Sequence, residues 1–343
     1  MAINEERLEG TALVAYGEGS FGLESIRTGP LTPDTIGIET AWSGVSFGSE
    51  FAVLRGKLNW GSYPLVTGYM GAGRVVHVGS RVDGYSLGDR VYYRANPELA
   101  LSSGAPLASA LGVHASVAVI DPRGDHGADH IPDSVPDDLA STFVLPAVGL
   151  NGVNDAGVSV GDTVVVIGVG MIGLAVVAAA AERGARILAI DIRDHPLEVA
   201  SKLGAHWTVN STQADAASVI RDTFGPDGVD YVFESTGTTD AIDLGISLLR
   251  DHGTFVWQGN YGQGKVSFQF LEAHYRRVRM LFPSDDGLRP CRRAVLDSMG
   301  AGRLRWDATI TNRIESDNAP DFYRGVYDNG LGGVLGASIR WDR

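Results

Sequence analysis

The segment VVVIGVGMIG, residues 164–173, decides the fold of this chain. Four apolar residues that suit a buried strand run into a G-x-G-x-x-G turn, and the apolar residues beyond it are spaced as in a helix. In such a turn the first glycine permits a tight bend, the second lets a pyrophosphate approach the backbone, and the third lets the helix pack on the strand. The helix N-terminus then offers free N–H groups to the pyrophosphate. The residues that we expect at a dinucleotide cofactor are Gly168, Gly170, Met171, Ile172 and Gly173.

Strands and helices alternate on the C-terminal side of this turn. Strand-like segments recur at residues 187–191, 207–210, 231–234 and 253–259, and segments with helical spacing occupy about residues 171–183, 196–203, 214–224 and 239–249. Such alternation predicts a doubly wound parallel sheet in an α/β fold.

The residues after the second strand of this series indicate which cofactor binds. Asp191 lies 18 residues beyond Gly173, about where an acidic side chain accepts hydrogen bonds from the adenosine ribose hydroxyls. A carboxylate there repels a 2′-phosphate, so NAD is favoured over NADP, although a cation at Arg193 softens that preference. We therefore place Asp191, Ile192 and Arg193 at the adenosine end. The alternative for Asp191 is an N-terminal cap of the next helix.

Two short segments are expected beside the nicotinamide. One is Glu234, Ser235, Thr236 and Gly237 at the end of one predicted strand, and the other is Gln258, Gly259 and Asn260 after the next. The carboxyl ends of parallel strands meet at one edge of the sheet, where such folds bind their ligands. The alternative is that both segments are ordinary turns, which have the same composition.

The remainder of the chain is β-rich at its start and mixed at its end. Residues 11–40 and 114–120 have the period of strands, and residues 63–93 place β-branched pairs between glycine turns, as a small barrel requires. Residues 137–153 have helical spacing, and residues 263–282 alternate again. We predict a dinucleotide-binding domain at 147–285, inserted into a second domain formed by 1–146 and 286–343.

Bulk properties exclude several classes of protein. A net charge of −13 over 343 residues, without a long Lys/Arg run, argues against nucleic acid as a partner. The opening MAINEERLEG lacks the pattern of a secretory signal, and the apolar stretch 164–181 divides into a strand and a helix, so we expect no membrane span. A single cysteine excludes an intrachain disulfide and fits a cytoplasmic protein.

A longer motif in the N-terminal third points to a family. The stretch YPLVTGYMGAGRVV, residues 63–76, is followed by Gly79 and by the GDRV of residues 88–91. Together with the glycine turn and Asp191, this pattern resembles the medium-chain dehydrogenase/reductase superfamily over the whole chain. The resemblance implies a GroES-like β-barrel catalytic domain beside a Rossmann domain with its doubly wound parallel sheet, and a homodimer.

The resemblance breaks at the positions that hold zinc in zinc-dependent relatives. The two residues after Gly68 are His and Glu in those relatives and are Tyr69 and Met70 here. The first zinc ligand of the family falls on Ser46, and the third falls near Leu145. Serine, tyrosine and leucine do not form a zinc site, and one cysteine does not form a structural zinc lobe. We therefore expect a zinc-independent member.

The segments SGVSFGSE, residues 43–50, and YPLVTGY, residues 63–69, are similar to the subgroup typified by bacteriochlorophyllide a dehydrogenase. This similarity implies NAD-linked oxidation of a secondary alcohol to a ketone. The protein contributes by aligning the substrate and by placing hydrogen-bond donors at its oxygen, because the cofactor itself accepts the hydride.

The donors nearest the lost zinc positions are the predicted catalytic residues. We expect Tyr69 to donate to the carbonyl oxygen in reduction, with Ser46 or Ser49 relaying the proton. The alternative for Tyr69 is an aromatic ring that fills the former metal pocket. Glu50 is a general base, an orienting group for the serines, or only a helix-dipole partner.

Several other residues are weaker candidates. His114 is expected to be structural. Tyr92, Tyr93 and Asn96 are candidates to line a substrate pocket, and Trp42 or Trp60 to cover it. The run RRVR, residues 276–279, is expected on a solvated strand, with an anionic substrate group as the alternative partner, and residues 266–270 are a candidate subunit edge.

The sequence therefore predicts an NAD-dependent medium-chain alcohol dehydrogenase or ketone reductase of a biosynthetic pathway, acting on a small molecule. Two alternatives remain open. One is an NADPH-dependent enone or quinone reductase, which an acid at Asp191 disfavours. The other is a cofactor-binding relative without turnover.

Overall fold

The chain divides into two units in the computed structural model, which describes residues 6–109, 111–262 and 264–342. Unit 1 comprises the described residues up to Phe143 and those from Ile310 onward, and unit 2 comprises Val144–Thr309. Residues 286–309, which we predicted in the first domain, therefore lie in unit 2. The reason is that α9 (Leu288–Gly300) packs against α3 (Val144–Ala156) and buries Val295 and Leu296.

Unit 2 contains the predicted parallel sheet. Among the described residues it has six strands in the order β12-β11-β10-β13-β14-β15, and each neighbouring pair is parallel. The strands are β10 Thr163–Ile167, β11 Arg186–Asp191, β12 Trp207–Asn210, β13 Val229–Glu234, β14 Leu249–Trp257 and β15 Arg279–Leu281. The order reverses between β10 and β13, which is the switch point where doubly wound sheets bind ligands.

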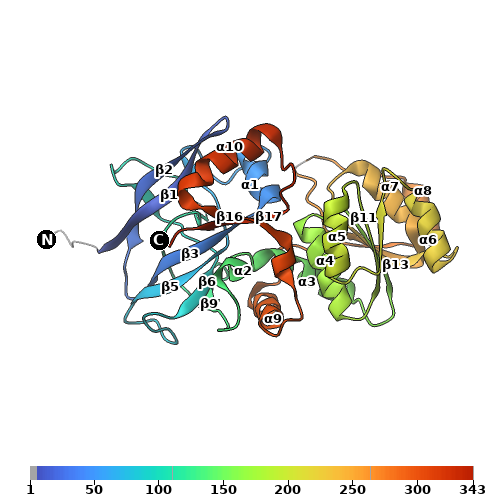
Figure 1. Cartoon of the computed structure of the whole chain (residues 1–343), viewed down its shortest axis with the longest axis horizontal. Helices are drawn as coiled ribbons and strands as arrows, with labels where there is room; N and C mark the ends of the chain where they lie inside the picture. Colours follow the sequence, from blue (N-terminus) through green and yellow to red (C-terminus); the bar gives the residue numbers. More distant parts are fainter. Residues whose placement is uncertain (1–5, 110, 263, 343) are drawn as a thin grey trace. The chain divides into compact units, whose positions relative to one another are not determined.

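Helices cover both faces of this sheet (Figure 1). One face carries α4 (Met171–Glu182) and α5 (Asp194–Lys202); the other carries α6 (Ala216–Phe224), α7 (Thr239–Leu248) and α8 (Phe270–Tyr275). Residues 173–180 of α4 are all buried, because both the sheet and α3 pack against this helix. A helix covered on both sides is apolar on both sides, which explains why residues 164–181 have no polar face.

Two sequence predictions in unit 2 are wrong. Residues 266–270 form no strand; Phe270 begins α8, and the strand at this end of the sheet is β15. The run RRVR is not one strand, because Arg276 is the C-cap of α8 and pairs with Glu272 at 2.6 Å, while Arg277 pairs with Asp251 at 3.0 Å. The spacing of Glu272 and Arg276, at i and i+4, is typical of a helix.

Unit 1 is built from β-strands whose neighbours are antiparallel, except that β16 and β17 pair parallel. One sheet has the order β4-β1-β2-β7; the other has the order β16-β17-β3-β5-β6-β9, with β8 also on β3. The strands are β1 Arg7–Gly17, β2 Ser20–Pro30, β3 Ile36–Val45, β4 Leu65–Val66, β5 Gly71–Val78, β6 Arg90–Tyr93, β7 Leu99–Leu101, β8 Val117–Ile120, β9 Ala128–His130, β16 Ile310–Glu315 and β17 Gly336–Arg340. The predicted helix at 137–153 is broken into α2 (Asp137–Ala140) and α3, which belong to different units.

The C-terminal segment of the chain completes unit 1. Strand β17 pairs antiparallel with β3, so residues near 340 lie beside residues near 43. Helix α10 (Ala319–Asn329) shares a core with α1 (Phe47–Leu54): the ring of Tyr323 stacks on that of Phe51 at a centroid distance of 5.4 Å. This packing brings Tyr323 next to the predicted residue Glu50.

No helix in the described ranges is long and apolar enough to cross a membrane.

Candidate active site

The glycine turn of unit 2 has the geometry that a pyrophosphate needs. Gly168 has a φ of +80°, and a Cβ on Gly173 would lie 1.9 Å from the Gly168 carbonyl oxygen, so glycine is required at both positions. A Cβ on Gly170 would meet nothing within 4 Å, so space is open above the turn. Helix α4 begins at Met171 without a side-chain cap, which leaves its first N–H groups for an anion. These residues fit a dinucleotide.

Asp191 ties the glycine turn to the end of β11. One of its carboxylate oxygens accepts a hydrogen bond from Val169 N at 2.9 Å, and the other accepts from Arg193 N at 3.0 Å and Arg193 Nε at 3.3 Å. The N-cap of α5 is Arg193, so Asp191 is not the helix cap that we considered. Ile192 is 65% exposed beside it.

The two segments predicted beside the nicotinamide lie together. Gly259 N donates to the Glu234 carbonyl oxygen at 2.7 Å, and a Cβ on Gly237 would lie 2.9 Å from the Asn260 carbonyl oxygen. Gln258 differs from the rest: its amide donates to Val148 O of α3 at 3.4 Å, so the side chain packs on a helix instead of pointing along the edge.

In unit 1, Tyr69 and Ser46 form a hydroxyl pair. Tyr69 follows β4, Ser46 precedes α1, and the tyrosine hydroxyl donates to Ser46 Oγ at 2.6 Å. Trp60 lies edge-on to the Tyr69 ring at 5.8 Å between centroids, and the Arg94 guanidinium lies 5.6 Å from the centroid. Burial raises the pKa of Tyr69 above its usual value, although Ser46, Ser49 and Arg94 act in the other direction. Tyr69 therefore stays protonated at neutral pH and suits a donor better than a base.

Glu50 is fully buried, and its carboxylate is surrounded by donors. Oε1 accepts from Ser46 N at 2.7 Å, while Oε2 accepts from Thr67 Oγ1 and Tyr323 OH, each at 2.8 Å, and lies 2.8 Å from His114 Nε2. Burial raises the pKa of this carboxyl, but the His114 ring and the hydrogen bonds outweigh burial and hold the pKa below its usual value. Of the roles we considered, this geometry favours orientation: Glu50 fixes the backbone at Ser46.

A chain of buried polar groups extends from Glu50. The second ring nitrogen of His114, Nδ1, lies 2.8 Å from Ser43 Oγ, which accepts from Trp341 Nε1 at 2.8 Å. Sequence reasoning placed His114 as structural but missed Ser43, Thr67, Tyr323 and Trp341. Single threonines, tyrosines and tryptophans carry no motif, and Trp341 lies 298 positions from Ser43 along the chain.

Three residues of unit 1 that we considered for a substrate pocket are buried in its core. Tyr93 OH lies 2.6 Å from Thr40 Oγ1, and Asn96 bonds both Val117 O and Val119 N; both side chains are fully buried. Tyr92 is equally buried and packs on Phe143 at 4.3 Å, so these three do not line an open pocket.

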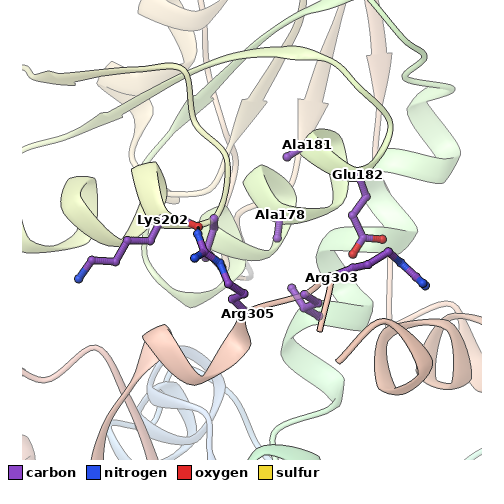
Figure 2. Close-up of a pocket in the computed structure, with 8 residues that line it drawn as sticks. Ala178, Ala181, Glu182, Lys202, Arg303 and Arg305 are labelled. Atoms are coloured by element: carbon purple, nitrogen blue, oxygen red, sulfur yellow. Dashed lines mark hydrogen bonds between the residues drawn. The ribbon is translucent and has the colours of Figure 1, made fainter. Parts of the chain in front are cut away.

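A surface pocket of about 200 Å³ in unit 2 is not a candidate site (Figure 2). Ala178, Ala181 and Glu182 of α4 line it together with Lys202, Arg303 and Arg305. Figure 2 shows the Lys202 ammonium and the Arg303 guanidinium pointing away from one another. Cations that diverge do not cradle a common anion.

The residues at the family's metal positions do not fit zinc. Ser46 and Tyr69 bond one another, Leu145 is apolar, and both ring nitrogens of the neighbouring His114 already have partners. Within the part of the chain that the structure describes, no group of three or more His, Cys, Asp or Glu is placed to hold a metal ion. The donor set lacks the soft or borderline ligands that zinc prefers.

The fold and these two groups of residues define an α/β dinucleotide-binding protein with an added, mostly antiparallel β-unit. Residues 32–124 match the model of the alcohol dehydrogenase GroES-like domain, and residues 171–284 match that of zinc-binding dehydrogenases. The chain belongs to the medium-chain dehydrogenase family of the zinc-binding type, and the predicted GroES-like and Rossmann folds are confirmed.

Named relatives of this chain are alcohol and polyol dehydrogenases. It is 27% identical over 329 residues to an alcohol dehydrogenase of Cupriavidus necator, covering 85% of this chain and 88% of the relative. It is 39% identical over 124 residues to the erythritol/L-threitol dehydrogenase of Mycolicibacterium smegmatis, a match that spans 36% of this chain and only 34% of that relative. A solved structure of a zinc-binding-type dehydrogenase from Sinorhizobium meliloti, bound to NADP, has a TM-score of 0.84 at 24% identity and covers 97% of this chain and 99% of its own.

Proposed function

We propose that the protein transfers hydride between NAD(H) and a secondary alcohol or polyol and its ketone, without zinc. The observation that carries this proposal is the Asp191 carboxylate at the end of β11, hydrogen-bonded to the glycine turn. A negative charge there favours the free ribose hydroxyls of NAD and opposes the 2′-phosphate of NADP. Two observations make the preference for NAD over NADP worth testing: a structural neighbour was solved with NADP bound, and the cation of Arg193 lies beside Asp191.

The nicotinamide, when bound, supplies the hydride acceptor for alcohol oxidation. In ketone reduction the substrate oxygen gains a proton as hydride reaches its carbon, and we assign that proton to the Tyr69–Ser46 pair: Ser46 gives up its hydrogen, takes the one from Tyr69, and the tyrosine regains a proton from water. Ser46 Oγ accepts the tyrosine hydrogen, so its own hydrogen is available to a substrate oxygen. In the ketone-reducing direction this donor stabilises the charge that develops on the oxygen. Glu50 holds Ser46 in place through the backbone N–H.

The test is a panel of alcohols, polyols, ketones and enones assayed with both cofactors on protein of measured metal content. We expect NAD-linked oxidation of a secondary alcohol or polyol that survives treatment with a chelator. Loss of activity on chelation, restored by zinc, would contradict the zinc-independent assignment. NADPH-linked reduction of enones would favour the enone reductase instead, and NADH binding without any turnover would favour the catalytically silent relative.

We also propose a homodimer, formed at the β15 edge of unit 2. Near β15 in the sequence, Phe270 and Tyr275 of α8 are 65% and 70% exposed, and Phe282, directly after β15, is 69% exposed. An apolar group of this kind beside an open strand edge favours a protein contact. Light scattering of the purified protein should give twice the chain mass of 36.3 kDa.

A further inference from the structure

Glu234, the first residue of the segment that we expect beside the nicotinamide, is a completely buried carboxylate at the end of β13. One oxygen accepts from Thr236 N at 2.6 Å and from the Thr236 hydroxyl; the other accepts from Gly237 N at 3.2 Å and from the hydroxyl of Tyr261. No Arg, Lys or His among the described residues pairs with it. A buried carboxylate without a cationic partner is costly unless hydrogen bonds satisfy each oxygen. Moving any of these donors away would expose that cost, so the donors and the backbone that carries them are held in place.

The carboxylate connects two loops that follow neighbouring strands. Thr236 and Gly237 belong to the loop after β13, and Tyr261 belongs to the loop after β14. The main chain of Glu234 adds a second link, because its carbonyl oxygen accepts from Gln258 N at 2.9 Å and Gly259 N at 2.7 Å. Glu234 thus bonds both loops through its side chain and one of them through its backbone as well.

The first of these loops also contacts the glycine turn. A Cβ on Gly168 would lie 2.5 Å from Thr236 Cγ2, so Thr236 packs directly on the turn. Similarly, a Cβ on Gly259 would lie 2.8 Å from Gly237 N and 2.9 Å from the Glu234 carboxylate. Three segments of the sheet edge therefore meet at Glu234.

Tyr261 is the part of this cluster that comes from farthest along the chain. Its ring is half-buried against Trp257, at 5.3 Å between centroids. Burial raises the pKa of Tyr261 well above its usual value, and the hydrogen bond to Glu234 and the charge of Glu234 raise it further. The phenol therefore remains a donor throughout the neutral range, which keeps the second loop attached to the carboxylate.

We propose that Glu234 and Tyr261 are positioning residues for the cofactor: together they preorganise the two loops that receive its nicotinamide half. The inference rests on the proposed function. Ordering a loop when a ligand binds costs conformational entropy, and loops that are already ordered avoid this cost. Glu234 and Tyr261 therefore raise the affinity for the dinucleotide without contacting it. The carboxylate acts on both loops, whereas Tyr261 acts on one.

The test is the dissociation constant of NADH for full-length Glu234→Gln and Tyr261→Phe proteins, with that of AMP as a second ligand. Glu234→Gln places amide hydrogens opposite N–H donors, and we expect NADH to bind about tenfold more weakly or worse, by analogy with lost hydrogen bonds to charged groups. Tyr261→Phe should weaken NADH by a smaller factor. AMP lacks the nicotinamide half, so its affinity should stay at the wild-type value in both variants.

A matched control is Glu272→Gln, the same change on α8, where the carboxylate pairs with Arg276 at the surface. It should bind NADH as the wild type does. The proposal is overturned if Tyr261→Phe and Glu234→Gln bind NADH with wild-type affinity, even where their melting temperatures fall. It is also overturned if the affinities for AMP and NADH fall by the same factor. If Glu234→Gln fails to fold, the Tyr261→Phe comparison still decides. A wild-type protein that does not bind NADH contradicts the proposed function itself, which is a separate outcome.

Discussion

Tyr69 carries the catalytic part of the account at the scale of a single residue. We expect Tyr69→Phe to lower turnover about 100-fold, as loss of one preorganised donor does elsewhere, and to leave the NADH dissociation constant unchanged. The matched control is Tyr93→Phe, which removes a buried hydroxyl bonded to Thr40 at the same 2.6 Å. Steady-state kinetics check both variants; wild-type turnover in Tyr69→Phe would mean that the ring only fills the former metal pocket.

Glu50 makes the stability of unit 1 depend on pH. Its folded-state pKa lies below the ordinary value of 4.5, so the stabilisation is present above that value and is lost as pH falls through the lower folded pKa. We expect Glu50→Gln to destabilise the protein at neutral pH and the difference from wild type to shrink in acid. The measurement is urea unfolding between pH 3 and 7. Glu39→Gln, an exposed change on β3, serves as the control and should show a constant difference.

The catalytic candidates show what single residues reveal in a sequence. Ser46, Tyr69 and Glu50 were found because they fall on or beside positions with a known pattern. Tyr323 and Trp341 were not, because they reach the site only through the packing of α10 on α1 and the pairing of β17 with β3. Glu234 was visible at the end of its strand, but its burial and its link to Tyr261 depend on how two loops close.

At the scale of elements, two glycines at the start of α4 allow cofactor binding and folding stability to be tested separately. Gly173→Ala places a methyl group on the Gly168 carbonyl, and we expect it to cost about 1–3 kcal/mol of stability, as overpacking does. Gly170→Ala adds its methyl in open space at a φ of −67°, so it should fold as well as the wild type and yet bind NADH at least roughly tenfold (about 1.4 kcal/mol) more weakly. Melting temperatures and NADH titrations check the pair. Normal NADH binding by Gly170→Ala would contradict a pyrophosphate at this turn.

The elements of unit 2 were largely predictable, because strict alternation of apolar strands and helices leaves few arrangements. The helix and strand boundaries from β10 to β14 fall within a few residues of those expected. The segment 263–282 was not predictable in this way: α8 has six residues and β15 has three. Elements that short contain fewer than two periods of the helical or strand pattern, too few to tell one pattern from the other.

At the scale of the whole molecule, the chain order determines how unit 1 is assembled. Unit 2 is inserted between Phe143 and Ile310, and the returning chain supplies β16, β17 and α10. This returning segment also supplies Tyr323 and Trp341, which belong to the buried hydrogen-bonded groups around Glu50. The sequence predicted the insertion but placed its second boundary 24 residues too early, at 285 instead of 309, because α9 carries no signal of the unit on which it packs.

The central claim is that this is an NAD-linked enzyme, and the most direct test is titration of purified protein with NADH and with NADPH. The same titrations on Asp191→Asn complete the test. Asparagine keeps an oxygen for the Val169 N–H but removes the charge that opposes a 2′-phosphate. We expect the wild type to bind NADH more tightly than NADPH, and the variant to lose that preference. Tighter binding of NADPH by the wild type, or an unchanged preference in Asp191→Asn, would contradict it.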